Sequence, residues 1–175
     1  MKLKLVCISA ILLTCLLIGG KFASADEPSA LCGISQDRIN TYKQRILPFA
    51  ETIRTTLKNF NVDERFIWLA MVESGGNTEA TSPHGASGLW QLTAATARHY
   101  GCLDRNDVLA STEAAARYLA KLYDDFNGDI WKVIVAYNMG GTNYKRTGKP
   151  TNEAKSLANT VTCLMENANY VSYDG

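Results

Sequence analysis

The sequence has few of the residues that bind metal ions and no large excess of charge of either sign. It contains two histidines, and the three cysteines after residue 25 are far apart. Zinc sites need cysteines and histidines at short spacings, so we expect neither a metal centre nor a cofactor. The chain carries 18 basic and 17 acidic residues. A dedicated nucleic-acid-binding domain would be strongly basic, so nucleic acid is not an expected partner.

Long apolar runs are absent beyond the N-terminal segment. Lys2 and Lys4 precede an apolar run over residues 5–18, and Ala23-Ser24-Ala25 provides small residues at a cleavage site. This pattern predicts a signal peptide over residues 1–25, and therefore an exported protein, periplasmic or extracellular. The run is short for a bilayer-spanning anchor, and the alternative of a lipid anchor at Cys15 would shorten it further. Residues 26–175 retain 15 basic and 17 acidic residues.

An exported chain with three cysteines is expected to form one disulfide and keep one thiol. The cysteines are Cys32, Cys102 and Cys163, and the sequence leaves three pairings open. We favour Cys32 with Cys163, which would tie the N-terminal extension to the last helix. The alternative is three buried free thiols.

Apolar residues recur at steps of three and four between residues 39 and 60 and predict an amphipathic helix. Pro48 should kink it or divide it into two helices in series. Asp63 can cap the next helix, which ends near Glu73. Residues 75–92 are rich in glycine and have no helical period, so they indicate a loop or a small β-tongue.

Further helices are expected at about 94–100, 112–127, 130–139 and 153–168. Thr93, Ser111 and Asp129 are the expected caps at the N-termini of the first three. Residues 142–151 are polar and include Gly148 and Pro150, so we predict a loop there. The predicted fold class is all-α, with little or no sheet.

Glu73 is the residue that most directly suggests chemistry. It stands near the end of a short apolar helix and directly before the glycine-rich segment. A carboxylate in such a place loses hydration, which favours the neutral acid, and a carboxyl that stays protonated near neutral pH can act as a general acid. A lone glutamate in the last turn of an amphipathic helix usually faces water. The assignment therefore depends on the surrounding motif.

Four separated motifs resemble those of the lytic transglycosylases, in the order in which they occur in that family. They are Glu73-Ser74 with Asn77, Ser82-Pro83-x-Gly85-Ala86-x-Gly88-Leu89-Trp90-Gln91, Ala136-Tyr137-Asn138 with Gly140, and Glu166-x-x-Asn169-Tyr170-Val171. Residues from about 40 to 171 thus resemble the soluble lytic transglycosylase, or goose-type lysozyme-like, superfamily, and most of all the membrane-bound lytic transglycosylase D type. The resemblance implies a lysozyme-like catalytic domain over residues 39–175, after a lead-in at 26–38. Thr93-Ala94 departs from the Met-Pro usual in the family.

The resemblance also implies a reaction on peptidoglycan glycan strands. Ordinary glycosidases use two carboxylates. Here one carboxyl, Glu73, would protonate the oxygen between N-acetylmuramic acid and N-acetylglucosamine and then take a proton from the muramic 6-hydroxyl. The product would be a 1,6-anhydro end, formed without water. The residues implied to bind the substrate are Ser82, Gln91, Tyr137, Asn138 and Tyr170.

Two alternatives remain open. A goose-type hydrolase on the same fold would need a second carboxylate across the cleft, for which Asp104, Asp107, Asp124 and Asp125 are candidates by composition alone. The other is a non-catalytic wall-binding scaffold in an envelope-spanning machine. Small family members of this kind accompany secretion, conjugation or pilus systems, so the resemblance makes such machinery a plausible partner and local wall opening a plausible task.

Overall fold

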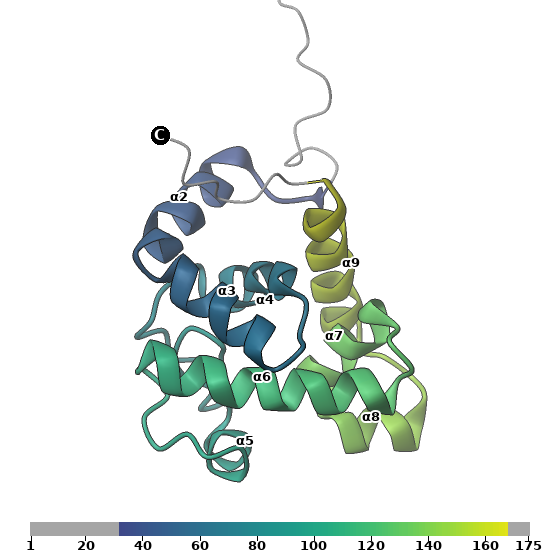
Figure 1. The fold of residues 1–175 in the computed structure, drawn as a ribbon. Helices are drawn as coiled ribbons and strands as arrows, with labels where there is room; N and C mark the ends of the chain where they lie inside the picture. The colour runs from purple at the N-terminus through teal and green to yellow at the C-terminus, as the bar shows by residue number, and fades with distance from the viewer. Residues whose placement is uncertain (1–31, 168–175) are drawn as a thin grey trace, which may run out of the picture.

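The structure is a computed structural model that describes residues 32–167, and it consists of helices joined by loops (Figure 1). The helices and 3-10 turns are α2 (Gln36–Ile46), η1 (Leu47–Phe49), α3 (Ala50–Asn59), η2 (Glu64–Phe66), α4 (Ile67–Ser74), α5 (Ala94–His99), α6 (Val108–Asp125), α7 (Ile130–Met139), α8 (Gly141–Thr147) and α9 (Asn152–Asn167). Between residues 32 and 167 the β-type pairing is limited to isolated bridges of Ser87 with Thr81 and with Leu92. The all-α fold class is therefore confirmed, and the segment 75–92, hereafter the tongue, contains these bridges.

The helical pattern over residues 39–60 divides where the sequence predicts. Pro48 lies in η1, between α2 and α3, because proline has no N–H for the helical ladder. Helix α2 begins at Gln36, three residues before the first periodic apolar residue, Ile39. Asp63 accepts a hydrogen bond from the Arg65 backbone N–H and so caps η2, which leads directly into α4. Thr93 and Asp129 cap α5 and α7 as predicted.

Two local predictions are wrong. Helix α6 begins at Val108, and its cap is Asp107, whose carboxylate accepts from the Ala110 N–H at 2.8 Å. Ser111, the predicted cap, is buried inside the helix. The predicted loop at residues 142–151 contains helix α8. A single buried aromatic, Tyr144, stacks on Phe126 with ring centroids 5.3 Å apart, and this anchor supports a helix whose polar composition gives no apolar period.

Helices α4 and α7 form the centre of the molecule. Residues 67–71 of α4 and 133–137 of α7 are all buried, as expected of helices that are apolar on every side. Helix α9 packs along α7 and also contacts α4, while the long helix α6 crosses α3 (Figure 1). Glu73 lies at the C-terminal end of α4, and Tyr137 and Asn138 lie at the C-terminal end of α7. The packing of these two helices in the core therefore fixes where the three side chains lie.

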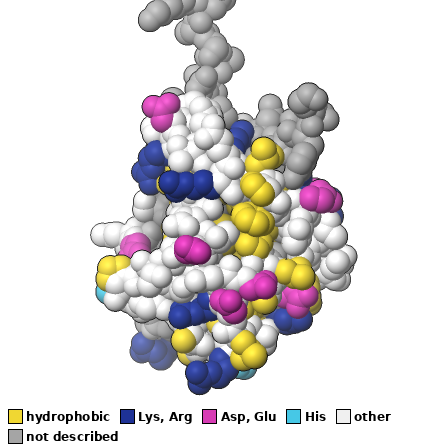
Figure 2. Space-filling view, turned by 90° about the vertical axis from the view of Figure 1, so that its left-hand side faces the viewer, with side chains coloured by type: hydrophobic (Ala, Val, Ile, Leu, Met, Phe, Trp, Pro, Cys, Tyr) yellow, Lys and Arg dark blue, Asp and Glu magenta, His cyan; other side chains and the backbone are white. Residues whose placement is uncertain are grey.

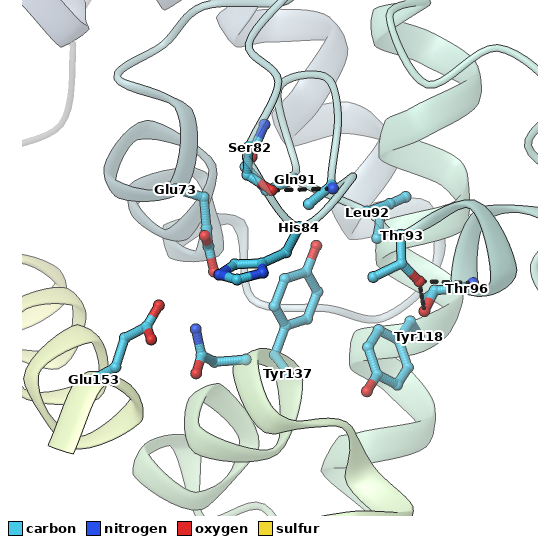
Figure 3. Close-up of a pocket in the computed structure, with 12 residues that line it drawn as sticks. Glu73, Ser82, His84, Gln91, Leu92, Thr93, Thr96, Tyr118, Tyr137 and Glu153 are labelled. Carbon is cyan, nitrogen blue, oxygen red and sulfur yellow. Dashed lines mark hydrogen bonds between the residues drawn. The ribbon is translucent and has the colours of Figure 1, made fainter. Parts of the chain in front are cut away.

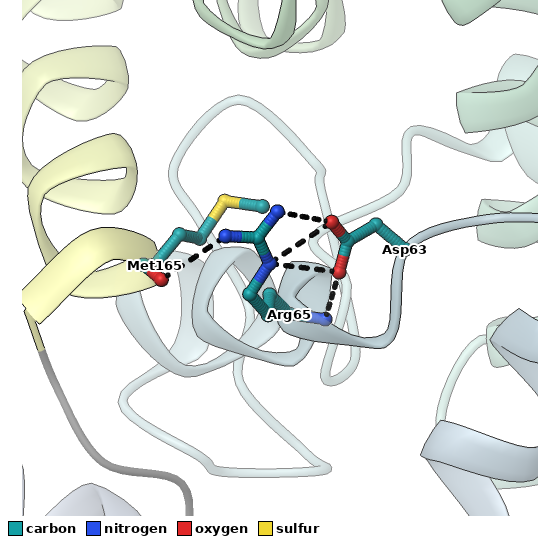
Figure 4. Close-up of polar contacts among 3 residues, drawn as sticks. All are labelled: Asp63, Arg65 and Met165. Carbon is teal, nitrogen blue, oxygen red and sulfur yellow. Dashed lines mark hydrogen bonds and ion pairs between the residues drawn. The ribbon is translucent and has the colours of Figure 1, made fainter.

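The far end of α9 is held in two ways. A disulfide joins Cys32 to Cys163, which confirms the favoured pairing, and Cys102 is a buried free thiol. The Arg65 guanidinium bonds the Asp63 carboxylate and donates to the Met165 carbonyl oxygen near the end of α9 (Figure 4). Burial opposes the charge on Asp63, but the hydrogen bonds from Arg65 outweigh it and hold the pKa of that carboxyl below its ordinary value.

Figure 2 shows acidic and basic side chains interspersed on one face, with apolar side chains between them. This mixture agrees with the near balance of charge in the sequence. Within residues 32–167, no helix combines the length and the apolar character needed to cross a membrane.

Candidate active site

A cavity of about 230 Å³ lies where the tongue meets the C-terminal ends of α4 and α7. Side chains from α5, α6 and the first turn of α9 complete its wall. Figure 3 shows Glu73, Tyr137 and Glu153 reaching this space from three different helices. The residues that line it are Glu73, Ser82, His84, Ala86, Gln91, Leu92, Thr93, Thr96, Tyr118, Tyr137, Asn138 and Glu153. The cavity brings together all the predicted site residues that fall within the described part of the chain.

Glu73 lies in the last turn of α4, one residue before the helix ends. Gly75 ends the helix in the left-handed conformation, with φ 65°. A Cβ on Gly76 would lie 2.9 Å from the carbonyl oxygen of Tyr42, so α2 approaches the turn too closely for a side chain. The absence of side chains at Gly75 and Gly76 thus allows α2 to pack closely against the end of α4.

The pKa of Glu73 is raised from 4.5 to about 7. The larger cause is the loss of hydration, because the side chain is only partly exposed to solvent. The smaller cause is the negative charge of Glu153. A carboxyl with a pKa near 7 exists in both protonation states at neutral pH, which is the property a group needs to act first as an acid and then as a base.

Glu153 is a site residue that the sequence analysis missed. It lies in the first turn of α9, where the helix dipole stabilises a negative charge, and its side chain points toward the pocket (Figure 3). Its position in the first turn of an expected helix is readable from the sequence, but that signal also fits a simple capping role. None of the four aspartates considered as a second carboxylate lines this pocket.

Tyr137 connects α7 to the tongue. Its hydroxyl donates to the carbonyl oxygen of Trp90 at 2.8 Å, and burial, together with the charge of Glu73, raises its pKa well above 10. Trp90 is fully buried and donates from Nε1 to Thr112 on α6 at 2.9 Å. Tyr137 is therefore both a core aromatic and a wall of the pocket, and its neutral hydroxyl fixes the tongue above Glu73.

Gln91 and Ser82 hold the shape of the tongue while they face the pocket. The Nε2 of Gln91 donates to the carbonyl oxygens of Ala80 and Gly88, so both of its N–H groups are used within the tongue. Its own backbone has φ 47°, a conformation that is uncommon for residues other than glycine. The hydroxyl of Ser82 accepts from the Ala86 N–H at 3.1 Å. The side-chain oxygen of Gln91 is the atom of this amide best suited to accept a hydrogen bond from a ligand.

Asn138 follows Tyr137 on α7 and lines the same pocket. Thr93 and His84 also line it, and both are exposed. Thr93 hydrogen-bonds Thr96 at the start of α5. Tyr170, the remaining predicted site residue, lies outside the described residues.

Among the described residues, no three His, Cys, Asp or Glu side chains gather as metal ligands would. Apart from the His84 imidazole, the polar side chains that line the pocket are carboxyl, amide and hydroxyl groups. Such groups exchange protons and bond sugar hydroxyl and amide groups. The chemistry available here is acid–base chemistry centred on Glu73.

Comparison with known proteins adds independent findings. The family model "Transglycosylase SLT domain" matches residues 51–159, a range that contains Glu73, the tongue, Tyr137 and Glu153. The chain is 32% identical over 139 residues to "Membrane-bound lytic murein transglycosylase D" of Escherichia coli (strain K12), which covers 68% of this chain and 30% of that protein.

Two further relatives match over shorter stretches of the chain. The chain is 34% identical over 119 residues to the "Putative tributyltin chloride resistance protein" of Alteromonas sp. (strain M-1), covering 64% of this chain and 58% of the relative. It is 35% identical over 106 residues to the "Transglycosylase" of Enterobacteria phage PRD1, covering 60% and 39%. The chain thus matches between about a third and somewhat over half of the length of these relatives.

Proposed function

Because this chain belongs to the family of the transglycosylase SLT domain, we propose that it is a peptidoglycan lytic transglycosylase with Glu73 as its single acid and base. The observation that carries the proposal is the position of Glu73. Its carboxyl has a pKa of about 7 and faces a cavity whose lining includes several amide and hydroxyl groups. The name of the Escherichia coli relative, a lytic murein transglycosylase, supports the choice of substrate.

The proposed reaction has two proton transfers at one carboxyl. Protonated Glu73 gives its proton to the oxygen that links N-acetylmuramic acid to N-acetylglucosamine, and the bond from that oxygen to the muramic C1 breaks. The Glu73 carboxylate then takes the proton of the muramic 6-hydroxyl, whose oxygen bonds to C1. Glu73 ends the cycle protonated, no water is consumed, and the muramic product carries a 1,6-anhydro ring.

Glu153 and the tongue have supporting roles in this scheme. The negative charge of Glu153 favours the protonated form of Glu73, which the first step needs. After the first step the same charge makes the Glu73 carboxylate a stronger base. Ser82, Gln91, Tyr137 and Asn138 surround the sugar in the pocket, and Tyr170 is proposed to join them from outside the described residues.

A goose-type hydrolase is the second candidate, and Glu153 is the observation that favours it. A second carboxylate in the same pocket could activate a water molecule for attack on C1. In that reaction Glu153 would act as the base, and the muramic product would have a free reducing end.

Mass spectrometry of muropeptides released from purified peptidoglycan tests both candidates. The transglycosylase gives anhydro-muramic products, which are lighter by one water than reducing ends, and Glu73→Gln abolishes them while Glu153→Gln leaves them detectable. Reducing ends that disappear in both variants would establish the hydrolase instead. Absence of products, with binding to peptidoglycan retained, would favour the wall-binding scaffold.

We further propose that residues 1–25 are a signal peptide and that the protein acts in the periplasm or outside the cell. The positively charged start, apolar run and small residues before Asp26 support this. The names of the relatives include membrane-bound enzymes. Local wall opening for a secretion, conjugation or pilus machine is proposed as the setting, and the detection of anhydro products confined to such a site in cells would test it.

A further inference from the structure

Trp90 ties the tongue to two helices. Its indole Nε1 donates to the Thr112 hydroxyl on α6 at 2.9 Å, and its backbone carbonyl oxygen accepts from the Tyr137 hydroxyl on α7 at 2.8 Å. The residue that follows it in the tongue is Gln91, which lines the Glu73 pocket (Figure 3). The position of Gln91 in the pocket therefore depends on how firmly α6 and α7 hold Trp90.

Thr112 carries a fully buried hydroxyl in the second turn of α6. This hydroxyl donates to the Val108 carbonyl oxygen at 2.6 Å, one turn earlier in the same helix. A threonine hydroxyl has one proton to donate and two lone pairs that can accept. Because the proton is given to Val108, the lone pairs are left for Trp90, and the helix itself sets the direction in which Thr112 accepts.

Water does not reach the bond between Trp90 and Thr112, because both side chains are fully buried. The indole N–H can only donate, and a buried donor that loses its partner is costly to leave unpaired. Without the Thr112 hydroxyl, the indole would stay unpaired or turn toward another acceptor. A turned indole would shift the backbone of the tongue at Trp90, and with it Gln91.

The tongue forms one wall of the pocket that encloses Glu73. Its side chains Ser82 and Gln91 line this wall, and the enclosure removes water from the Glu73 carboxyl, which raises its pKa to about 7. Thr112 does not line the pocket, so it acts there only through Trp90. A tongue that is held less firmly would admit water to the carboxyl and displace the Gln91 amide.

We propose that Thr112 is a positioning residue for the reaction at Glu73, because through Trp90 it holds the tongue over the pocket, keeps Gln91 in place and keeps water from the carboxyl. This role rests on the proposed function, since it concerns the group proposed as acid and base. The hydroxyl at residue 112 is the part that the role requires, and the methyl group of threonine is not required.

Activity on purified peptidoglycan tests this role with two variants at residue 112. Thr112→Val keeps the size of the side chain but removes the hydroxyl. Its kcat/KM for muropeptide release should fall by about tenfold to a hundredfold, as expected for a small misplacement at an active site. Thr112→Ser keeps the hydroxyl and should retain most of the activity. Ser111→Ala is the matched control and should leave kcat/KM unchanged, because Ser111 is also buried in α6 and donates to the same Val108 carbonyl oxygen, at 3.3 Å.

The titration of Glu73 is a readout that a merely structural role would leave unchanged. NMR of the side-chain carboxyl carbon follows it with no substrate present. In Thr112→Val the midpoint should move from about pH 7 toward the ordinary 4.5, because water regains access to the carboxyl. Thr112→Ser and Ser111→Ala should titrate as the unmodified protein does. These variants remove no titratable group, and the described ones that line the pocket with Glu73 all remain, namely His84, Tyr118, Tyr137 and Glu153.

The two readouts separate this role from the proposed function. If the unmodified protein releases no product, but Thr112→Val lowers the Glu73 midpoint and Thr112→Ser restores it, the positioning role stands and the proposed function fails. If product is released and Thr112→Val keeps both kcat/KM and the midpoint, the positioning role is wrong and the function stands. A loss of kcat/KM in Ser111→Ala as large as that in Thr112→Val would also overturn the role, because any buried hydroxyl in this turn would then matter equally.

Trp90→Phe provides a second route if Thr112→Val does not fold. It breaks the same hydrogen bond from the side of the tongue, keeps an aromatic ring, and leaves the Thr112 hydroxyl bonded to Val108. The Glu73 midpoint should fall in this variant as well. An unchanged midpoint would overturn the positioning role, because the tongue would then keep water from Glu73 without this bond.

Discussion

Glu73 makes the folded protein less stable at neutral and alkaline pH, because burial favours its neutral form. With a pKa of about 7 when folded and 4.5 as the ordinary value, the folded state binds a proton between these values that the unfolded state has lost. Stability therefore falls as pH rises from about 4.5 to 7. At pH 8 the free energy of unfolding of Glu73→Gln should exceed that of the unmodified protein by up to about 3 kcal/mol, so the variant should melt at a higher temperature.

Thermal unfolding followed by circular dichroism at pH 4 and pH 8 checks this prediction. At pH 4 both side chains are neutral, so the two proteins should melt at similar temperatures. A stabilisation that is equal at both pH values would mean that packing of the amide, and not the charge of Glu73, is the cause. The experiment requires no substrate, so it tests the environment of Glu73 separately from the reaction.

Glu153 should set part of the pH dependence of activity. Activity that needs protonated Glu73 should decline with a midpoint near pH 7 in kcat/KM. Glu153→Gln removes the smaller cause of the raised pKa, so the midpoint should move to lower pH but stay above that of an ordinary glutamate. Glu51→Gln is the matched control, because Glu51 also lies in the first turn of a helix and is exposed. A midpoint that does not move in Glu153→Gln would contradict the proposed coupling.

The sequence identified Glu73 and the main pocket residues because they stand in motifs. It could not identify Glu153, whose role depends on how the start of α9 is turned toward α4. The resemblance implied substrate binding by Gln91, but it did not reveal that the N–H groups of this amide bond Ala80 and Gly88 within the tongue. Side-chain orientation across elements has no periodic signal in a sequence, so these features became visible only in the structure.

The tongue is the element on which the pocket most depends, and the loop between α5 and α6 braces it. Arg105 donates to the carbonyl oxygens of Gly85 and Leu92, and Ser87 donates to the side-chain oxygen of Asn106. Gly88 has φ 78°, and a Cβ there would lie 1.8 Å from the Arg105 carbonyl oxygen. Backbone atoms would have to move to make room for this Cβ. The tongue and the loop between α5 and α6 therefore could not both keep their positions.

Gly88→Ala should therefore lower stability by about 3 kcal/mol or more and strongly reduce muropeptide release. Gly85→Ala is the matched control: φ is 79°, but a Cβ there would meet nothing within 4 Å. It should cost only the strain of a left-handed residue, about 1–2 kcal/mol. Urea denaturation and product release from both variants provide the measurements. If Gly88→Ala and Gly85→Ala lose equal stability and activity, the cause would be the strain of a left-handed residue and not the contact with Arg105.

The elements themselves were largely predictable, and the two errors have a common cause. Apolar periodicity located the helices that bury a face, and proline or capping residues located most of their ends. Asp107 and Ser111 both offer oxygen acceptors, and local sequence does not say which one faces the first turn. Helix α8 has one buried aromatic, Tyr144, so its stability comes from a contact with Phe126 that local pattern cannot reveal.

At the scale of the whole molecule, the disulfide closes nearly all of the described chain into one loop. Cys32 and Cys163 are 131 residues apart in sequence, and closing a long loop restricts the unfolded chain more than the folded one. The bond holds one end of α9, while the other end of that helix carries Glu153 into the pocket. Its loss should therefore weaken the whole fold and the active site together.

Replacing Cys32 and Cys163 by serine should destabilise the protein by about 3 kcal/mol, which corresponds to roughly 10 °C in Tm for a chain of this size. Thermal unfolding with and without a reducing agent checks this. Reductant should lower the Tm of the unmodified protein toward that of the double variant and leave the variant unchanged, because Cys102 has no partner among the described cysteines. The double variant and the oxidised unmodified protein could instead have the same Tm. In that case α9 is held by its packing on α7 and by Arg65, and the disulfide has no measurable part in fixing the position of Glu153.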